Sequence, residues 1–254
     1  MPSRQQRPVG MITSSRTISN SNLRGMFIID TSCMLAPSHQ ELSRLVQSWV
    51  VHVRRLTELL AIKLGGYRPE RHAPQAWTRQ YQAGAWTYLE DLSERPRYSI
   101  MAGYLDALSP CRILDVGCGE GLLARKILHL PFITYVGIDV SPAPVATAQE
   151  ALGDDLRLTF AVADAESYDP DRMFDAIVFS ECLNYLSDPV GIVERYSKSI
   201  ASNGSIIISL FQSPRADKAW EMLKPITKFI DCVNIAHHSG KRWTIKLLKP
   251  HARC

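Results

Sequence analysis

The sequence has none of the cysteine patterns that would indicate a metal centre or a disulfide framework. Its six cysteines include no C-x-x-C pair, and no histidine stands at zinc-finger spacing from any of them. A chain of 254 residues, 46% of them hydrophobic, can build a core without covalent cross-links. We therefore expect reduced thiols, no bound metal and a cytoplasmic location.

Long apolar runs are also missing. The longest stretch without a charged residue, 199–214, contains serines, an asparagine and a glycine, and it is too short and too polar to cross a bilayer. At the amino end no secretory hydrophobic segment is present, and no acidic residue precedes Asp30. Such a composition also occurs in organelle transit peptides, but we favour a disordered tail over residues 1–37.

An excess of charge of one sign is the third absence. The net charge is +4, and the basic residues are scattered apart from loose clusters at both ends. Proteins that bind nucleic acids concentrate lysine and arginine on one face. We therefore expect neither a nucleic acid nor a membrane as partner, and a small molecule as substrate.

A helical segment precedes the main domain. Ser38 and Glu41 have the spacing of a capping box, and apolar residues then recur at helical spacing until Gly65 and Gly66. We assign residues 38–75 to an amino-terminal appendage without recognisable chemistry. Residues 67–95 overlap its end, are rich in aromatic side chains and are predicted to form a loop.

Residues 76–254 have the pattern of one α/β domain, in which short apolar runs alternate with helical segments. Ser141 followed by Pro142 predicts a helix start with a side-chain cap. The predicted strands are 112–116, 134–138, 156–163, 176–179, 205–210, 229–236 and 243–248. The predicted helices are 97–108, 120–130, 142–152, 189–200 and 215–223.

The last two predicted strands are joined by a turn at His238, Ser239 and Gly240, which is too short for a parallel connection. They must therefore form an antiparallel hairpin, whereas helices fall between most of the other strands, which are expected to run parallel. The expected fold is α/β: a doubly wound, mostly parallel seven-stranded sheet of Rossmann-like type, with a carboxyl-terminal antiparallel hairpin and amino-terminal helices.

The strongest local motif lies at the end of the first predicted strand. Asp115 ends a buried run and is followed by Gly117, Gly119 and Gly121, which open a helix. Glycines allow a sharp turn and a close approach of a ligand to the main chain, and a helix amino terminus offers free N–H groups. The glycines also fit the dinucleotide pattern G-x-G-x-x-A, so this loop alone does not identify the ligand.

Acidic residues end the next two strands. Asp139 ends the second strand, where a carboxylate can accept two hydrogen bonds from a ribose diol. Asp164 ends the third strand, where it can accept from the exocyclic amine of adenine. Ser180 and Glu181 end the fourth strand at the same edge of the sheet. Together these positions predict a site for an adenosine-containing cofactor.

With these motifs in this order, the chain resembles the class I S-adenosylmethionine-dependent methyltransferases over about residues 76–254. Residues 115–121 are similar to their first motif, D-x-G-x-G-x-G. The resemblance implies that Asp115 and the backbone at 117–119 hold the methionine part of S-adenosylmethionine. The cofactor-binding residues that it implies are Asp115, Gly117, Cys118, Gly119, Asp139, Val140, Asp164, Ala165 and Ser180.

The charge of the site favours this cofactor. S-adenosylmethionine carries an ammonium and a sulfonium, which a carboxylate at Asp115 attracts, whereas the same carboxylate would repel a pyrophosphate. Glu181 and Tyr185 are the candidate catalytic residues, since related enzymes often line the methyl-transfer pocket there. A role of Glu181 in positioning the cofactor and simple packing of the Tyr185 ring fit the sequence equally well. The histidine that many of them carry in this region is replaced by Asn184 or Tyr185, which argues against a histidine base.

Aromatic residues ahead of the sheet are candidates for a lid, because they could attract the sulfonium through their π faces. They are Tyr81, Trp86 and Tyr98, and Arg97 lies beside them. Packing of the preceding helix against the domain explains them equally well.

Three other functions remain open at this point. An NAD(P)-dependent oxidoreductase would share the glycine loop and Asp139. The acids at Asp115 and Asp164 argue against this class, because its cofactor does not require them. A methyltransferase acting on nucleic-acid bases often carries N-P-P-Y after strand four, where this chain has Ser180 to Leu183. A non-catalytic scaffold could bind the cofactor without turnover. We expect methyl transfer to an oxygen or nitrogen atom of a small-molecule acceptor.

Overall fold

The computed structural model describes residues 74–251 and seven positions between 46 and 60. All seven have helical backbone; they are Val46, Trp49, Val50, Val53, Leu56, Thr57 and Leu60. The predicted tail, the capping box and the rest of the appendage lie outside the described residues. Within the described part of the chain, no helix is long and apolar enough to span a membrane.

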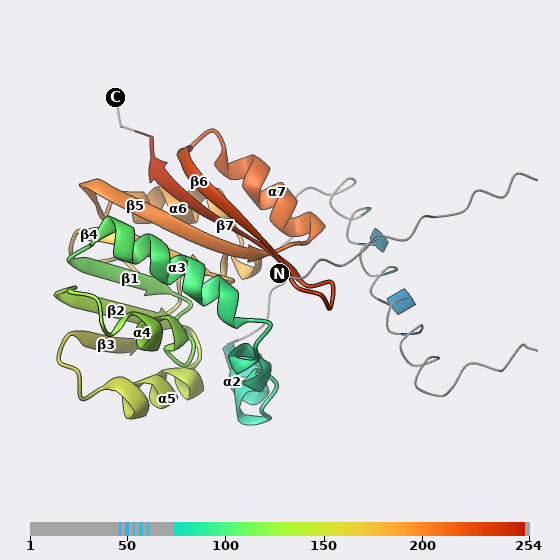
Figure 1. Ribbon diagram of the computed structural model, residues 1–254, viewed down its shortest axis with the longest axis horizontal. Helices are drawn as coiled ribbons and strands as arrows, with labels where there is room; N and C mark the ends of the chain where they lie inside the picture. The colour runs from blue at the N-terminus through green and yellow to red at the C-terminus, as the bar shows by residue number, and fades with distance from the viewer. Residues whose placement is uncertain are drawn as a thin grey trace, which may run out of the picture. The chain divides into compact units, whose positions relative to one another are not determined.

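Residues 74–251 fold into helices and strands that mostly alternate from β1 onward, except that β4 directly follows β3 and β7 directly follows β6 (Figure 1). The helices are α2 (Pro74–Gln82), η2 (Thr87–Glu90), α3 (Arg95–Leu108), α4 (Leu122–Ile127), α5 (Pro142–Leu152), η3 (Leu183–Tyr185), α6 (Pro189–Ser197) and α7 (Pro214–Leu223). The strands are β1 (Arg112–Val116), β2 (Thr134–Asp139), β3 (Leu158–Val162), β4 (Phe174–Ser180), β5 (Ile200–Phe211), β6 (Thr227–Ala236) and β7 (Arg242–Pro250).

The strands form one seven-stranded sheet in the order β3-β2-β1-β4-β5-β7-β6. The pairs from β3 to β5 are parallel, and β7 is antiparallel to both β5 and β6. The predicted fold class is thereby confirmed, including the reversed hairpin. Because the order of the strands reverses between β1 and β4, a crevice opens there at their carboxyl ends, where open α/β sheets bind ligands.

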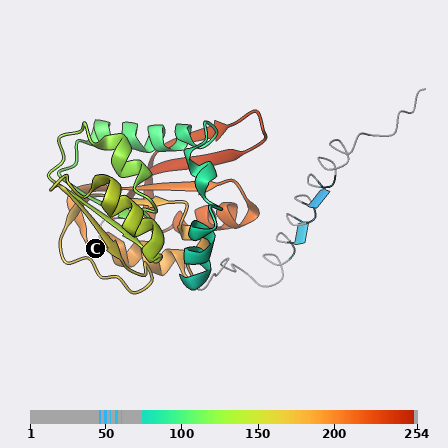
Figure 2. The ribbon, with the colours of Figure 1, turned by 90° about the horizontal axis from the view of Figure 1, so that it is seen from below.

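Two apolar layers hold helices on the two faces of this sheet. Side chains of α3, α4 and α5 pack on one face against alternate residues such as Ile113 and Tyr135. Side chains of α6 and α7 pack on the other face against the intervening residues, such as Leu114 and Ile138. Figures 1 and 2 accordingly place α3 and α7 on opposite sides of the strands. Because successive side chains of a strand point to opposite faces of the sheet, each strand contributes alternate residues to both apolar cores.

The structure differs from the sequence predictions in several places. The segment predicted as a loop over 67–95 contains α2 and η2 within its described part. Helix α4 is shorter than predicted, and β5 begins five residues earlier, at Ile200 rather than Ser205. Ser141 does not cap α5 with its side chain. Its hydroxyl instead shares a 3.0 Å hydrogen bond with Thr78 Oγ1 of α2, which ties α2 to the end of β2.

Candidate functional site

A cleft of about 1060 Å³ lies at the carboxyl ends of the parallel strands. Every residue that the sequence assigned to a site lines it: Asp115, Gly117, Cys118, Gly119, Asp139, Val140, Asp164, Ala165, Ser180, Glu181 and Tyr185. The three strand-end carboxylates thus share a single cleft beside Gly119. Its volume is near the upper end of the range of about 300–1,000 Å³ for small-molecule sites, which leaves room for two molecules.

The glycine loop between β1 and α4 brings the main chain close to the cleft. Gly117 has a φ of +76°, and a Cβ there would lie 2.7 Å from Cys182 Cβ. Gly117 N and Cys118 N both donate to Ile138 O, at 2.8 and 3.0 Å. Gly119 N donates to Asp139 Oδ2 at 3.1 Å. These three amides, which precede α4, are therefore satisfied inside the protein and are not available to a pyrophosphate.

Asp139, at the end of β2, faces the cleft and also accepts the hydrogen bond from Gly119 N that fixes the glycine loop. Its second oxygen, Oδ1, accepts from Ser141 N at 2.9 Å. Burial raises the pKa of this carboxyl, and the backbone donors partly offset that effect. Asp164, after β3, is exposed, and its Oδ1 accepts from Glu166 N at 2.9 Å. Each carboxylate oxygen has two lone pairs, so both side chains retain capacity for a ligand.

Asp115 is the most deeply buried acid of the cleft, at 1% exposure. Tyr135 donates its hydroxyl to Asp115 Oδ2 at 2.5 Å, whereas Asp115 Oδ1 is buried without a partner. Burial raises the pKa of Asp115 to about 7, and the nearby Asp139 carboxylate adds to the effect, while Tyr135 and Arg97 oppose it. A buried acid with an unmet acceptor is matched by a cationic donor from outside the protein.

Unmet polar atoms gather at this cleft. Among the described residues, four buried side-chain nitrogen or oxygen atoms have no hydrogen-bond partner, and three of them belong to cleft residues: Trp86 Nε1, Asp115 Oδ1 and Asn184 Oδ1. Buried polar groups are nearly always paired, so an unpaired one requires a reason. A bound molecule that supplies two donors and one acceptor gives that reason.

An aromatic wall formed by α2, η2 and η3 closes one side of the cleft. Trp77 packs edge-on against Tyr185, with ring centroids 4.8 Å apart. Trp86 packs against Trp77, Tyr81 and Tyr88 at centroid distances of 5.5, 5.7 and 5.8 Å. The predicted lid aromatics Tyr81 and Trp86 thus lie at the cleft, and Trp77 joins them without having been predicted. Its spacing of four residues from Tyr81 on a helix is the signal that could have identified it.

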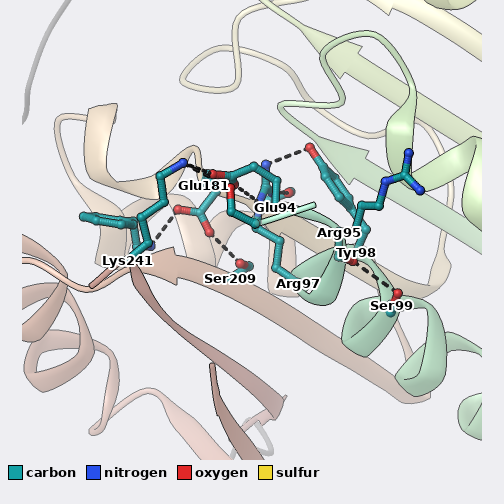
Figure 3. A network of polar contacts seen from close by, with 11 residues as sticks. Glu94, Arg95, Arg97, Tyr98, Ser99, Glu181, Ser209 and Lys241 are labelled. Carbon is teal, nitrogen blue, oxygen red and sulfur yellow. Dashed lines mark hydrogen bonds and ion pairs between the residues drawn. The ribbon is translucent and has the colours of Figure 1, made fainter. Parts of the chain in front are cut away.

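A buried ionic network also lines the cleft, and Figure 3 shows its side chains. Arg97 Nε donates to Glu94 Oε2 at 3.0 Å, and both residues are 3% exposed. The guanidinium also donates to Ser180 Oγ at 3.1 Å. Lys241, from the turn between β6 and β7, donates to Glu94 Oε1 at 3.0 Å. The hairpin is thereby tied to α3 and to the end of β4, a connection that no sequence motif indicated.

Glu181 follows β4 in a left-handed backbone conformation, with a φ of +58°. Ser209 Oγ donates to its Oε1 at 2.5 Å, and Phe211 N donates to its Oε2 at 2.6 Å. Burial raises the pKa of Glu181, and the guanidinium of Arg97 opposes that rise. Non-glycine residues adopt this conformation at a cost and are concentrated at functional sites. The carboxylate is consequently fixed in place rather than free to swing.

These features divide the cleft into two halves. The half over β1, β2 and β3 offers the glycine loop and the acids Asp115, Asp139 and Asp164. Arg97, which faces Asp115 from α3, is paired with Glu94. This donor set suits a nucleoside joined to a cation, and it does not suit a dinucleotide. The half over β4, β5 and the hairpin offers Glu181, the ionic network and the aromatic wall, with room for a second molecule.

Comparisons with known proteins agree with this geometry. A family model described as a methyltransferase domain matches residues 114–206. A malonyl-[acyl-carrier protein] O-methyltransferase of Ilyobacter polytropus is 36% identical over 100 residues, which are 39% of this chain and 37% of that protein. An uncharacterized methyltransferase of Mycobacterium bovis is 30% identical over 144 residues, which are 55% of this chain and 70% of that protein.

Among solved structures, the N-methyltransferase NodS from Bradyrhizobium japonicum WM9, in complex with S-adenosyl-L-homocysteine, superposes with a TM-score of 0.59 at 18% identity. That match covers 66% of this chain and 92% of NodS and bears on the fold. The chain spans 37%, 58% and 47% of the length of the first three curated relatives. Fold, motifs and relatives together place this chain in the class I S-adenosylmethionine-dependent methyltransferase family, whose cofactor is S-adenosylmethionine.

Proposed function

We propose that this chain transfers a methyl group from S-adenosylmethionine to an oxygen or nitrogen atom of a small-molecule acceptor. The observation that carries the proposal is the buried, unpartnered Oδ1 of Asp115 beside a glycine loop whose amides are already satisfied. An acid in this position attracts the ammonium and sulfonium of the cofactor and opposes the pyrophosphate that an NAD(P)-dependent oxidoreductase would require.

Each residue of the cofactor half has a part in this proposal. When bound, S-adenosylmethionine supplies an electrophilic methyl group whose leaving group is a neutral thioether. Asp115 would bind the ammonium, and the backbone at 117–119 would lie along the methionine part. Asp139 would accept from the ribose hydroxyls. Asp164 would accept from the adenine amine, and Val140, Ala165 and Ser180 would complete the lining.

The acceptor half mainly positions a nucleophile. Holding two reactants in line supplies up to about 7–11 kcal/mol of the acceleration in well-oriented systems, so the protein needs little further chemistry. Glu181 has lone pairs beyond those that Ser209 and Phe211 use, and with Tyr185 it would orient the acceptor. For a hydroxyl or ammonium acceptor, Glu181 would also take the proton, which contributes about 10²–10⁴-fold.

The nature of the wall supports a small acceptor. Aromatic side chains and the ion pair of Arg97 with Glu94 line this half. Its other basic residues are Arg215, Lys241 and Arg242, and Lys241 is also paired with Glu94. The names of relatives include a trans-aconitate 2-methyltransferase and a malonyl-[acyl-carrier protein] O-methyltransferase. These names support small acceptor groups and leave the acceptor atom to experiment.

Turnover tests the proposal directly. The full chain is incubated with S-adenosylmethionine and a panel of phenols, carboxylic acids and amines, and production of S-adenosylhomocysteine is measured. We expect at least one chemical class to raise production above the rate without acceptor. Calorimetric binding of S-adenosylhomocysteine with no turnover on any class would favour the non-catalytic scaffold, and binding of NADH instead would contradict the proposal.

Replacing Asp139 with alanine is expected to weaken S-adenosylhomocysteine binding about 30- to 150-fold, since hydrogen bonds to a carboxylate worth about 2–3 kcal/mol in total are lost. Part of the loss comes from Gly119, whose amide loses its acceptor. Calorimetry measures the affinity. Asp164→Ala, at an exposed position, serves as comparison and should cost about tenfold at most. Unchanged affinity in a folded Asp139→Ala protein would refute the ribose assignment.

Replacing Glu181 with glutamine is expected to lower kcat by at least about 10²-fold with an acceptor that must lose a proton, and to leave S-adenosylhomocysteine affinity within a few-fold. Ser209→Ala is the matched variant, because it removes one donor to Glu181 and keeps the carboxylate. It should retain most of the activity. Full activity of Glu181→Gln would remove Glu181 from the catalytic residues.

A further inference from the structure

Tyr135 has a feature that the fold alone does not require. It lies on β2, is fully buried, and does not line the cleft. A tyrosine in a core needs a partner for its hydroxyl, and the partner here is the cofactor-half acid Asp115, at 2.5 Å. The remaining contacts of the ring are apolar or aromatic, with Phe132 and Phe160 at centroid distances of 6.3 and 6.0 Å. Phenylalanine would fill the same space.

The hydrogen bond leaves the two oxygens of Asp115 unequal. Oδ2 is occupied by Tyr135, and Oδ1 is buried without a partner. A carboxylate that accepts one strong hydrogen bond from behind is held in one rotamer, with its other oxygen available on the ligand side. The phenol also favours the charged form of Asp115, which an ammonium ligand needs.

We infer that Tyr135 is a positioning residue for cofactor binding, which orients Asp115 and favours its ionised form so that its Oδ1 can bind the ammonium of S-adenosylmethionine. This inference rests on the proposed function, because it assigns the ammonium of that cofactor to Asp115. Tyr135 lies within β2 and outside the lining of the cleft, so its position alone would indicate only a packing role.

Other charged or titratable groups from neighbouring elements also face Asp115. Asp139 from β2 raises the pKa of Asp115, and Arg97 from α3 lowers it. Cys118 of the glycine loop and Cys182 after β4 also face it, but burial holds the pKa of both thiols well above the ordinary value. Tyr98 of α3 has a pKa raised to about 12 by burial. Of the hydroxyls and thiols that face Asp115, only that of Tyr135 donates a hydrogen bond to it among the described residues.

The consequence is a specific dependence of affinity on pH. In the wild type, affinity for S-adenosylhomocysteine should rise as pH increases through the titration of Asp115, because the ionised form binds the ammonium. Removing the phenol hydroxyl raises the pKa of Asp115, so the same rise should occur at higher pH. A residue that only fills space would change affinity equally at every pH.

The test measures affinity by calorimetry for two probes, S-adenosylhomocysteine and 5′-methylthioadenosine, in the wild type and in Tyr135→Phe. The second probe lacks the amino-acid part and therefore has no ammonium. For S-adenosylhomocysteine we expect the variant to lose about tenfold in affinity near pH 7, to recover most of it at more alkaline pH, and to show a midpoint shifted upward. For 5′-methylthioadenosine we expect the variant and the wild type to agree at every pH.

Tyr196→Phe is the matched control, because Tyr196 is also fully buried and its hydroxyl donates to a backbone oxygen, that of Ala165, at 3.1 Å. It should leave the midpoint unmoved. An unshifted midpoint in Tyr135→Phe, or an equal loss for both probes, would overturn the role of Tyr135 while leaving the proposed function intact. Failure of the wild type to bind either probe would instead count against the proposed function, and a wild-type S-adenosylhomocysteine affinity that does not vary with pH would overturn the inference without any variant.

Discussion

Asp115→Asn is expected to weaken S-adenosylhomocysteine binding about 150-fold or more and, at the same time, to make the free protein more stable. The loss follows because removing one partner of a buried charge pair costs about 3–5 kcal/mol. The gain follows because a carboxylate that is buried in the free protein is costly to ionise. The two effects have opposite signs, which separates a binding role for Asp115 from a purely structural one.

The sign of the stability change depends on pH. Asp115 has a pKa of 3.8 in its ordinary state and about 7 in the folded protein, so the folded protein binds more protons between these values and loses stability as pH rises through them. Above that range the penalty is complete, and a shift of about three units corresponds to about 4 kcal/mol as an upper bound. Asparagine carries no charge at any pH, so the variant does not have this ionisation penalty.

Thermal unfolding of the wild type and Asp115→Asn, without ligand, measures this difference. We expect a higher Tm for the variant at pH 8 and a much smaller difference near pH 3, where the wild-type carboxyl is mostly protonated in both states. Calorimetry on the same samples gives the affinity. A variant that binds S-adenosylhomocysteine normally, or that is less stable at pH 8, would contradict the account of Asp115.

Gly117→Val is expected to abolish measurable cofactor binding. The backbone at Gly117 has a φ of +76°, which costs a residue with a side chain about 1–2 kcal/mol. A new Cβ would also lie 2.7 Å from Cys182 Cβ, so the loop between β1 and α4 must move. Because this loop lines the cleft, the movement changes the site itself. Calorimetry with S-adenosylhomocysteine measures the loss, and circular dichroism checks the fold.

Two further variants test the cause of that loss. Gly117→Ala should lose most of the binding, and adding Cys182→Gly, which removes the atom that the new Cβ meets, should restore a substantial part of it. Gly103→Ala, in α3 with nothing within 4 Å of the added atom, should bind normally and gain about 0.5–1 kcal/mol in stability. Full binding by Gly117→Val would show that the glycine loop does not contact the cofactor.

Much of the sheet could be predicted because its signals are local. Residues 112–116 and 142–152 have the predicted bounds, since a buried apolar run and a Ser-Pro helix start each depend on neighbouring residues. Helix α2 was missed because its aromatic residues face the cleft and other aromatics rather than an apolar core, and none of its residues is buried. The start of β5 was missed because Ala201 to Gly204 have the composition of a turn.

The site was predictable to the extent that strand ends determine it. Asp115, Asp139 and Asp164 could be brought to one cleft from sequence, because the carboxyl ends of parallel strands share one edge. The hydrogen-bond and ion-pair partners of the cleft's acidic residues could not be predicted from the sequence. Tyr135 reaches Asp115 from inside the sheet, and Lys241 reaches Glu94 across 147 residues of sequence. Such contacts depend on which face each side chain takes and on how the hairpin lies against α3.

The most direct test of the central claim is a crystal structure of the full chain with S-adenosylhomocysteine. The account predicts the ammonium within hydrogen-bond distance of Asp115 Oδ1, the ribose hydroxyls on Asp139, and the sulfur facing the half of the cleft that contains Glu181. A ligand bound outside this cleft, or one whose ammonium lies away from Asp115, would contradict it.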